Sequence, residues 1–418
     1  MAAASWFAAD DARRAAGIGG LVADGRDVAW LDGGTVGRSV IGFDADVAIE
    51  ADDLEAIRAV ERMWRAEPSA VWIGCLSYDF AADLVLGRRP IPRSLPGCIL
   101  RRYPTWIEIA AEGRVDVHGV VPELAARDED ISSEWPLGPL APVWSAQDYR
   151  ARVALAQRHI VAGDTYQVNL AQRFFAPWRT PCPADELVRR AAALYLRLRA
   201  KAPAERGALL RVPGGVVLSN SPETLVDVDR DAQGKAVAYA RPIKGTRPRA
   251  ATAQADRAAA DELATSAKDL AEHVMIVDLV RNDLGRLALA GSVSAPTRPA
   301  ALALPTVHHL VSEIRATLRP DVGLVDLCAA LVPGGSITGA PKRRTIEIIE
   351  ALEQHARGIY CGAIVLLEPT GLRMSIPIRT ALVDTAGMSL HAGGGIVVDS
   401  EPEAERLECL AKIRAFQP

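Results

Sequence analysis

Residues 359–398 read IYCGAIVLLEPTGLRMSIPIRTALVDTAGMSLHAGGGIVV, and this stretch decides the fold. It holds strand-like runs that follow one another with only short turn segments between them. An earlier block of strand-like runs precedes it, and helical segments separate the two blocks. The runs are 207–229 and 235–243 in the first block, and 359–367, 373–383 and 388–398 in the second. Strands in consecutive blocks favour an α+β fold with antiparallel sheet over the strand–helix alternation of a Rossmann arrangement.

The sequence predicts one boundary that divides the chain into two regions. Residues 122–145 carry four prolines and an acidic cluster without a helical or strand period, which predicts a surface linker. Residues 1–121 precede it as an N-terminal region, with a helix over 52–67 and a buried strand over 70–78. Residues 146–418 follow as a C-terminal body.

Composition excludes several classes of protein. The 418 residues are 49% hydrophobic and 24% charged, as in an ordinary folded chain, and the net charge of -4 gives no overall attraction to nucleic acid or an anionic membrane. We find no secretory signal and no apolar run near the roughly 18 residues that span a bilayer. The six cysteines are scattered, without a C-x-x-C pair or zinc spacing. We therefore expect a cytoplasmic protein, with no nucleic-acid or membrane partner.

A glycine-rich stretch, PGGSITGAPKRRTIEIIEALE, covers residues 333–353. Pro341 stands where a helix begins, and backbone N–H groups there, with Lys342 and Arg343 nearby, predict an anion site. Gly334 and Gly339 have the spacing of a nucleotide-binding P-loop, but Ala-Pro-Lys follows where that motif needs Gly-Lys and a hydroxyl residue. Nucleotide triphosphate binding is thus disfavoured, and a turn that merely starts a helix remains an alternative.

Two predicted helices carry carboxylates. Glu272 lies within 266–289, off a stripe of apolar residues at helical spacing that includes Val274, and by itself it is most simply a solvated side chain. Glu405 and Glu408 lie three apart on a later helix, whose start at Ser400 matches a capping box. Because Mg²⁺ prefers carboxylate and ligand oxygens, these two helices together suggest a bridged Mg²⁺ ion.

Two further stretches carry possible chemistry. In SNSPETLVDV, residues 219–228, Glu223 follows a proline at a strand start, which suits either a general acid or an ordinary edge-strand carboxylate. In RPIKGTRPR, residues 241–249, Lys244 stands among three arginines. A lysine in a loop is usually a solvated side chain, so this crowding of cations needs an explanation.

These stretches occur in a recognisable order. SPETLVDV, RPIKGTRPR, DLVRNDLGR, PGGSITGAPK, IPIRT and AGGGIVVDSEPEAE together resemble the chorismate-utilising enzymes, which include anthranilate, isochorismate, salicylate and aminodeoxychorismate synthases. The resemblance covers roughly residues 145–418 and is looser before them, where WIGCLSYDFA is the best match. The segment that forms a tryptophan pocket in feedback-regulated relatives is not found.

The resemblance implies a fold and a reaction. The family fold is α+β, with two antiparallel sheets packed face to face, helices outside, and the site in the cleft between them; the N-terminal region contributes strands and helices to the same body. Anthranilate synthases resemble this chain but carry alanine at the position of Lys244, whereas the aminodeoxychorismate synthases carry lysine. This similarity implies that the Lys244 amine attacks C2 of chorismate and expels the C4 hydroxyl, after which ammonia adds at C4.

A nucleophilic lysine must be neutral part of the time. Desolvation and neighbouring cations favour the neutral amine, and arginines 241, 247 and 249 are placed to supply such cations. Isochorismate and salicylate synthases have a water-activating lysine in a motif that resembles YQVNLAQR of this chain. At the matching position this chain has Gln167. Glutamine is no base near neutral pH, so ammonia rather than water is the expected nucleophile.

The remaining roles follow from the same resemblance. Glu223 matches the general acid, His309 the active-site histidine beside His308, and Glu272 and Glu408 the Mg²⁺ ligands, with Glu405 as a neighbouring or water-mediated one. The expected substrate-binding residues are Gln167, Gly245, Thr246, Thr338, Tyr360, Arg379, Gly393, Gly394 and Gly395.

The resemblance also implies partners and leaves alternatives. Ammonia is expected from a separate glutamine amidotransferase subunit, and the product from chorismate leads to 4-aminobenzoate and folate. Component I of anthranilate synthase is the nearest alternative. From another class, a nucleotide-binding or regulatory module remains, for which the sequence offers little support.

Overall fold

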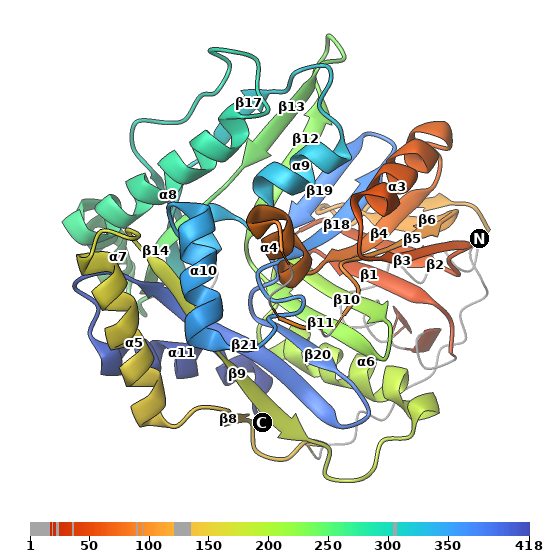
Figure 1. Ribbon diagram of the computed structural model, residues 1–418. Coiled ribbons are helices and arrows are strands. Elements are labelled where there is room, and N and C mark those ends of the chain that lie inside the picture. The colour runs from red at the N-terminus through yellow and green to blue at the C-terminus, as the bar shows by residue number, and fades with distance from the viewer. Residues whose placement is uncertain are drawn as a thin grey trace.

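The computed structural model describes residues 17–18, 20–21, 25–35, 37–88, 91–93, 95–120, 135–303 and 307–418. Within this part of the chain, the strands form three sheets of antiparallel neighbours, and helices surround the two large sheets (Figure 1). The predicted α+β class, with two antiparallel sheets face to face, is confirmed.

The larger sheet has ten strands, which come from three separate stretches of the chain. In spatial order the strands are β7 (Val115–His118), β6 (Thr105–Ile109), β2 (Ser39–Phe43), β1 (Val28–Asp32), β10 (Arg206–Val212), β11 (Gly215–Ser221), β20 (Thr380–Val383), β21 (Gly387–Ile396), β9 (Val168–Pro177) and β8 (Ala141–Pro142).

The second sheet has eight strands, and a small third sheet has three. The eight are, in spatial order, β17 (Ile314–Thr317), β13 (Ala236–Ala240), β12 (Thr224–Arg230), β19 (Gly371–Ser375), β18 (Ala363–Glu368), β4 (Val71–Leu76), β5 (Cys98–Tyr103) and β3 (Val47–Ala51). The three are β14 (Ile243–Pro248), β16 (Val307–Val311) and β15 (Ala300–Ala303).

The core has a middle layer and two outer layers. Val40 and Leu210 of the ten-stranded sheet pack with Ile73 and Ile364 of the eight-stranded sheet in the middle layer. Helices cover the outer faces of the two large sheets, except for Ala253–Thr265, which packs on the third sheet. They are α3 (Leu54–Ala66), α4 (Tyr78–Leu86), α5 (Ala146–Val161), α6 (Ala184–Lys201), α7 (Ala253–Thr265), α8 (Ala267–Gly285), α9 (Leu324–Leu331), α10 (Lys342–Glu353) and α11 (Pro402–Lys412), with short 3₁₀ turns η1 (Gly335–Ile337) and η2 (Arg414–Phe416).

Strands from the N-terminal region belong to both large sheets. Strand β1 pairs with β10, and β4 pairs with β18. Residues 121–134, most of the predicted linker, lie outside the described residues. The division into an N-terminal region, a linker and a C-terminal body remains a prediction.

One predicted strand is two strands. The run 373–383 splits into β19 and β20, which belong to different sheets. Pro377 stands between them, and proline cannot donate to a strand ladder. Residues 376–379 therefore carry the chain from one sheet to the other, and residues 222–223 do the same between β11 and β12.

Among the described residues, no single helix has the length and apolarity to cross a bilayer; one bent pair, Leu324–Ile337 with Lys342–Glu353, meets those criteria by length and composition, with a 63° bend.

Candidate active site

A cleft opens where the two crossing segments, the end of β21 and the third sheet meet. It encloses about 690 Å³, part of it open to solvent. Seven of the residues predicted for the site line it: Glu223, Lys244, Tyr360, Arg379, Gly393, Gly394 and Gly395. Sequence analysis missed other lining residues, among them Asn169, Ser336, His391 and Lys412.

The two crossing segments hold Glu223 and Arg379 side by side. The Ile376 N–H donates to the Glu223 carbonyl at 3.0 Å, and the Asn220 N–H donates to the Arg379 carbonyl at 2.9 Å. Arg379 has a φ of 49°, a left-handed backbone conformation that non-glycine residues seldom adopt. Backbone hydrogen bonds therefore fix where the carboxyl and the guanidinium enter the cleft.

Glu223 has the electrostatics of an acid. Burial raises its pKa, and the charges of Lys244, Arg379 and Lys412, with a hydroxyl of Ser336 at 3.4 Å, offset only part of that rise. A protonated carboxyl is favoured to a higher pH than in an ordinary glutamate. With three cations facing one carboxyl, the cleft suits a ligand that carries negative charge.

Lys244 reaches the cleft through an irregularity in its strand. β14 pairs with β16, and the register shifts between Lys244 and Thr246 around Gly245, whose φ is 69°. A Cβ on Gly245 would lie 2.8 Å from a methyl of Leu263, so the position favours glycine twice over. The backbone irregularity at Gly245 thus sets the direction in which the Lys244 side chain enters the cleft.

The three arginines near Lys244 do not crowd it with charge, contrary to the sequence interpretation. Arg241 pairs with Glu313 at 2.8 Å, and Arg249 pairs with Asp256 at 2.7 Å. Arg247 bonds both Glu262 and Asp269 on the neighbouring helices. Carboxylates of α7, α8 and β16's end neutralise these cations, so the groups whose charges couple to Lys244 are instead Glu223, His273 and Glu408.

Glycines form one wall of the cleft because a larger side chain at these positions would clash with its neighbours. A Cβ on Gly395 would lie 2.8 Å from the Gln167 side-chain amide, and one on Gly393 would lie 2.1 Å from the Leu170 carbonyl. Gln167 is thus packed against the wall, with its Nε2 lacking a partner among the described residues. Thr338 is fully buried and hydrogen-bonds Gly334 and Asn169 through its hydroxyl and carbonyl. Thr338 therefore does not line the cleft but hydrogen-bonds Asn169, which does.

Tyr360 lines the cleft. It is buried, and burial keeps the pKa of its hydroxyl well above the ordinary value, so the hydroxyl remains a donor. Its ring stacks on His391, with centroids 5.6 Å apart. His391 was missed because a lone histidine in a strand carries no pattern that marks it.

The adjacent histidines point to different partners. The Nδ1 atom of His309 lies 3.0 Å from the Thr246 hydroxyl and 3.1 Å from the Gly245 carbonyl. The Nε2 atom of His308 lies 2.9 Å from Asp256 on α7. His309 is therefore the one that contacts the lysine-bearing loop, although it does not line the cleft itself.

Two of the three predicted metal ligands converge on Gly394. A Cβ on that glycine would lie 2.9 Å from Glu405 Oε2, and 3.9 Å from Glu408 Oε1 and Lys412 Nζ. Burial raises the pKa of Glu405. Burial alone would do the same to Glu408, but the Lys412 ammonium at 2.8 Å, together with the charges of Lys244 and Lys268, outweighs burial and lowers the pKa of Glu408. These oxygens fit the donor set that Mg²⁺ prefers.

Glu272 is not brought into that group. In the described part of the chain, no three His, Cys, Asp or Glu side chains gather as a metal site. Glu272 is half-buried on α8, where Lys268, one turn earlier, acts electrostatically on Glu405 and Glu408. The predicted capping box at Ser400 is also not formed: Glu401 caps α11, and the Ser400 hydroxyl donates to Glu405 at 2.7 Å.

The predicted anion site at the start of α10 is not supported. The helix begins at Lys342, as Pro341 predicts, but the Lys342 ammonium donates to Asp283 and to the Ala330 carbonyl, both at 3.0 Å. Arg343 donates to backbone carbonyls at the end of α4. Both cations therefore serve helix packing, which weighs against a nucleotide-binding module.

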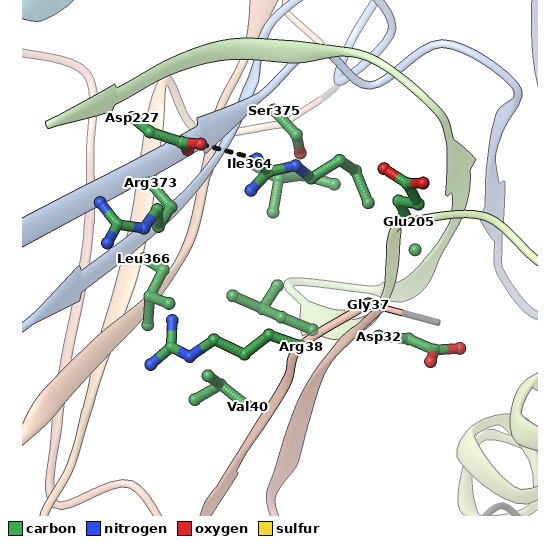
Figure 2. A pocket seen from close by; sticks show the side chains of 13 residues that line it. Asp32, Gly37, Arg38, Val40, Glu205, Asp227, Ile364, Leu366, Arg373 and Ser375 are labelled. Carbon is green, nitrogen blue, oxygen red and sulfur yellow. Dashed lines mark hydrogen bonds and ion pairs between the residues drawn. The ribbon is translucent and has the colours of Figure 1, made fainter. Parts of the chain in front are cut away.

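A second cavity, of about 820 Å³, lies between the two large sheets (Figure 2). Its arginines are each held by carboxylates: Arg206 bonds Asp227 at 2.7 Å, Arg38 bonds Glu108 and Glu368, and Arg373 bonds Asp229. The residues predicted for the site are absent from its lining. The cleft, rather than this cavity, gathers the chemistry.

A buried acid, a lysine and two further cations in one cleft of an α+β sandwich give a site that suits an anionic ligand. Residues 26–418 match the sequence model of the chorismate binding enzymes, and the chain belongs to that family.

Two individual members of the family are similar in sequence to this chain. Aminodeoxychorismate synthase component 1 of Escherichia coli (strain K12) is 42% identical over 287 residues, which are 68% of this chain and 59% of that protein. Anthranilate synthase component 1 of Pseudomonas putida is 37% identical over 274 residues, which are 65% of this chain and 53% of that protein. The chain thus covers less than two thirds of the length of each.

A solved structure shares the fold. Anthranilate synthase component I from Streptococcus pneumoniae TIGR4 superimposes with a TM-score of 0.76 over 91% of this chain and 92% of that one, at 24% identity. At that identity the likeness concerns the fold alone.

Proposed function

We propose that this chain acts as component I of an aminodeoxychorismate synthase, which converts chorismate and ammonia to 4-amino-4-deoxychorismate. The observation that carries the proposal is Lys244, aimed by the Gly245 bulge into a cleft where it faces the buried carboxyl of Glu223. The similarity to the E. coli component supports the same reading.

The residues of the cleft supply each step. The Lys244 amine attacks C2 of chorismate and loses a proton, both ring double bonds shift, and the C4 hydroxyl leaves as water with the proton of Glu223. Ammonia then adds at C4 and loses a proton, both double bonds shift back, and the C2–N bond breaks as Lys244 leaves with a proton. Arg379 suits a bidentate grip on one substrate carboxylate, and the Tyr360 hydroxyl is a neutral donor beside it.

A Mg²⁺ ion completes the proposed site. Glu405 and Glu408 would hold it near Gly394, and it would neutralise a substrate carboxylate. Glu272 of α8, the third ligand in the prediction, does not gather with them in the described part of the chain. His309 would orient the lysine-bearing loop through Thr246 and Gly245.

The proposal extends to partners and setting. Ammonia would come from a separate glutamine amidotransferase subunit, and the product would feed 4-aminobenzoate and folate synthesis. All six cysteines are free and buried, which is consistent with a reducing, cytoplasmic setting.

The test is the product formed from chorismate, Mg²⁺ and excess ammonium by the purified chain, beside Lys244→Ala. We expect aminodeoxychorismate from the unmodified chain, and its loss or a shift toward anthranilate in the variant. Anthranilate from the unmodified chain would instead favour the anthranilate synthase alternative, and full activity without Lys244 would remove the covalent step.

A further inference from the structure

His391 lies in the wall of the cleft and has no role in the reaction proposed above. It stands on β21, which pairs with β9 (Figure 1), shortly before the glycines of the wall. It lines the cleft together with Tyr360, and only 8% of its surface is exposed. Buried polar side chains are nearly always hydrogen-bonded, so the partners of this ring indicate what it does.

The His391 ring has no hydrogen-bond partner in the described part of the chain. Its Nε2 atom is buried without one. Its Nδ1 atom also forms no hydrogen bond to the described residues, but this atom is not fully buried. Because the residue lines the cleft, the Nδ1 edge of the ring is the edge that a ligand can reach.

Contacts with other rings hold the imidazole in place. Tyr360 stacks on it, with centroids 5.6 Å apart and an angle of 23° between the ring planes. The ring of His355 lies 5.1 Å from it and lines the small cavity between α4 and α10 rather than the cleft. Packing therefore orients His391, and its hydrogen-bonding capacity is left for a ligand.

The ring is neutral, with its proton favoured on Nδ1. Burial lowers the pKa of His391 well below the ordinary value, and His355, Arg357 and Arg173 lower it further, with no carboxylate of the described chain to counteract them. A neutral imidazole has one N–H donor and one acceptor nitrogen. An N–H group buried without a partner is rarer than an acceptor in that position. The bare nitrogen is thus favoured at the buried Nε2, and the N–H at Nδ1.

The surroundings suit an oxygen of an anionic ligand as the acceptor. Lys244, Arg379 and Lys412 line the same cleft and favour negative charge there. The Tyr360 hydroxyl is one neutral donor, and the His391 Nδ1–H group stands beside it as another. A carboxylate accepts several hydrogen bonds at once, so these donors can act on one carboxylate together with a guanidinium.

We propose that His391 is a further substrate-binding residue, whose Nδ1–H group donates to an oxygen of the substrate carboxylate that Arg379 and Tyr360 bind. This inference rests on the proposed function, in which chorismate supplies that carboxylate. The carboxylate does not react, so the hydrogen bond is equally strong before and during the reaction. It therefore strengthens the binding of chorismate without accelerating the chemical step.

Three replacements of His391 separate the hydrogen bond from the ring. His391→Phe keeps a ring that stacks on Tyr360 but removes the donor, so the KM for chorismate should rise at least about tenfold while kcat stays within about threefold. His391→Asn has an amide nitrogen as many bonds from Cβ as Nδ1, and its KM should stay within about threefold of the unmodified value. His391→Gln places its amide nitrogen where Nε2 lies and should not restore binding.

His355→Phe is the matched control. It makes the same exchange in the neighbouring ring, outside the lining of the cleft, and should leave the KM for chorismate within about twofold of the unmodified value. Equal effects of His355→Phe and His391→Phe would show that ring packing, not a hydrogen bond, is responsible, and would overturn the proposal. An unchanged KM in His391→Phe overturns it too, as does rescue by glutamine instead of asparagine.

A binding measurement separates this proposal from the proposed function. Isothermal titration of chorismate into Lys244→Ala, without ammonium, follows binding where no covalent bond to residue 244 can form. Adding His391→Phe to this variant should raise the Kd for chorismate at least about tenfold, whereas adding His391→Asn should not. If the unmodified chain forms no aminodeoxychorismate, the proposed function fails, and the titration still decides the role of His391. An unchanged Kd with His391→Phe overturns that role.

Discussion

Replacing Glu223 with glutamine tests the acid directly. The change keeps the size of the side chain and its contact with the Ser336 hydroxyl but removes the proton that, in the proposed reaction, goes to the departing C4 hydroxyl. General acid catalysis contributes about 10²–10⁴ in rate. At about 1.4 kcal/mol for each factor of ten, the barrier should rise by about 3–5 kcal/mol.

The structure predicts where this loss appears. Lys244, Arg379 and Lys412 all act electrostatically on Glu223, and glutamine, like the protonated acid, places no negative charge beside them. Binding of an anionic substrate should therefore hold or tighten, so that kcat falls while the KM for chorismate does not rise. The steady-state rate of product formation, followed by chromatography at saturating ammonium and Mg²⁺, measures both constants.

The pH profile supplies a second readout. Because burial raises the pKa of Glu223, the acid stays protonated above the range of an ordinary glutamate, and kcat should fall as pH rises through that raised pKa. Glu223→Gln should lack this limb. Glu205→Gln in the cavity between the sheets is the matched control and should keep both rate and profile. A variant at Glu223 with kcat within about threefold of the unmodified chain and the same profile would refute the role.

Three predictions concern stability. Arg357→Met leaves Glu353, 1% exposed and paired with Arg357 at 2.6 Å, without its counter-charge, and should cost about 3–5 kcal/mol in urea unfolding; a loss below 1 kcal/mol would contradict a buried pair. Gly339→Ala puts a Cβ 2.0 Å from the Gln167 carbonyl at a φ of 144°, and should lower the free energy of unfolding by about 1–3 kcal/mol. Thermal unfolding measures this loss, and an unchanged Tm would show that the backbone at Gln167 moves to make room for the methyl group. The raised pKa of Glu350 makes the folded state bind its proton more tightly, so the free energy of unfolding should fall as pH rises from 4.5 to about 7, and Glu350→Gln should flatten that decline.

Ordered motifs carried much of the site prediction. Glu223, Lys244, Tyr360 and Arg379 are far apart in the sequence, yet all four line one cleft. Spacing and chemistry alone left Lys244 and Glu223 with ordinary alternatives, a solvated lysine and an edge carboxylate, and did not single out Tyr360 or Arg379. Their common placement follows from the order of the motifs, because that order specifies a topology that individual stretches do not.

Tertiary partners explain what the sequence did not reveal. Arg247 reads as a cation beside Lys244, but its charge is met by Glu262 and Asp269 from two helices that pack there only in the folded chain. Val274 has helical spacing with buried neighbours but is 52% exposed, because α8 buries a narrower face than its apolar residues suggest. The local sequence pattern therefore determines neither which residue a charged side chain pairs with nor how wide the buried face of a helix is.

The position of the cleft follows from how the chain changes sheets. Pro222 and Pro377 each stand in a segment that leaves one sheet for the other, where a missing N–H ends strand pairing at little cost. Backbone hydrogen bonds join these segments to each other, and the Cys361 N–H donates to the Pro377 carbonyl at 3.1 Å, which ties Tyr360 to the same place. The acid, the guanidinium and the phenol are thus set by the backbone of the sandwich rather than by mobile loops. Their geometry is established when the sheets pack, so the cleft is organised for charge stabilisation before a substrate enters.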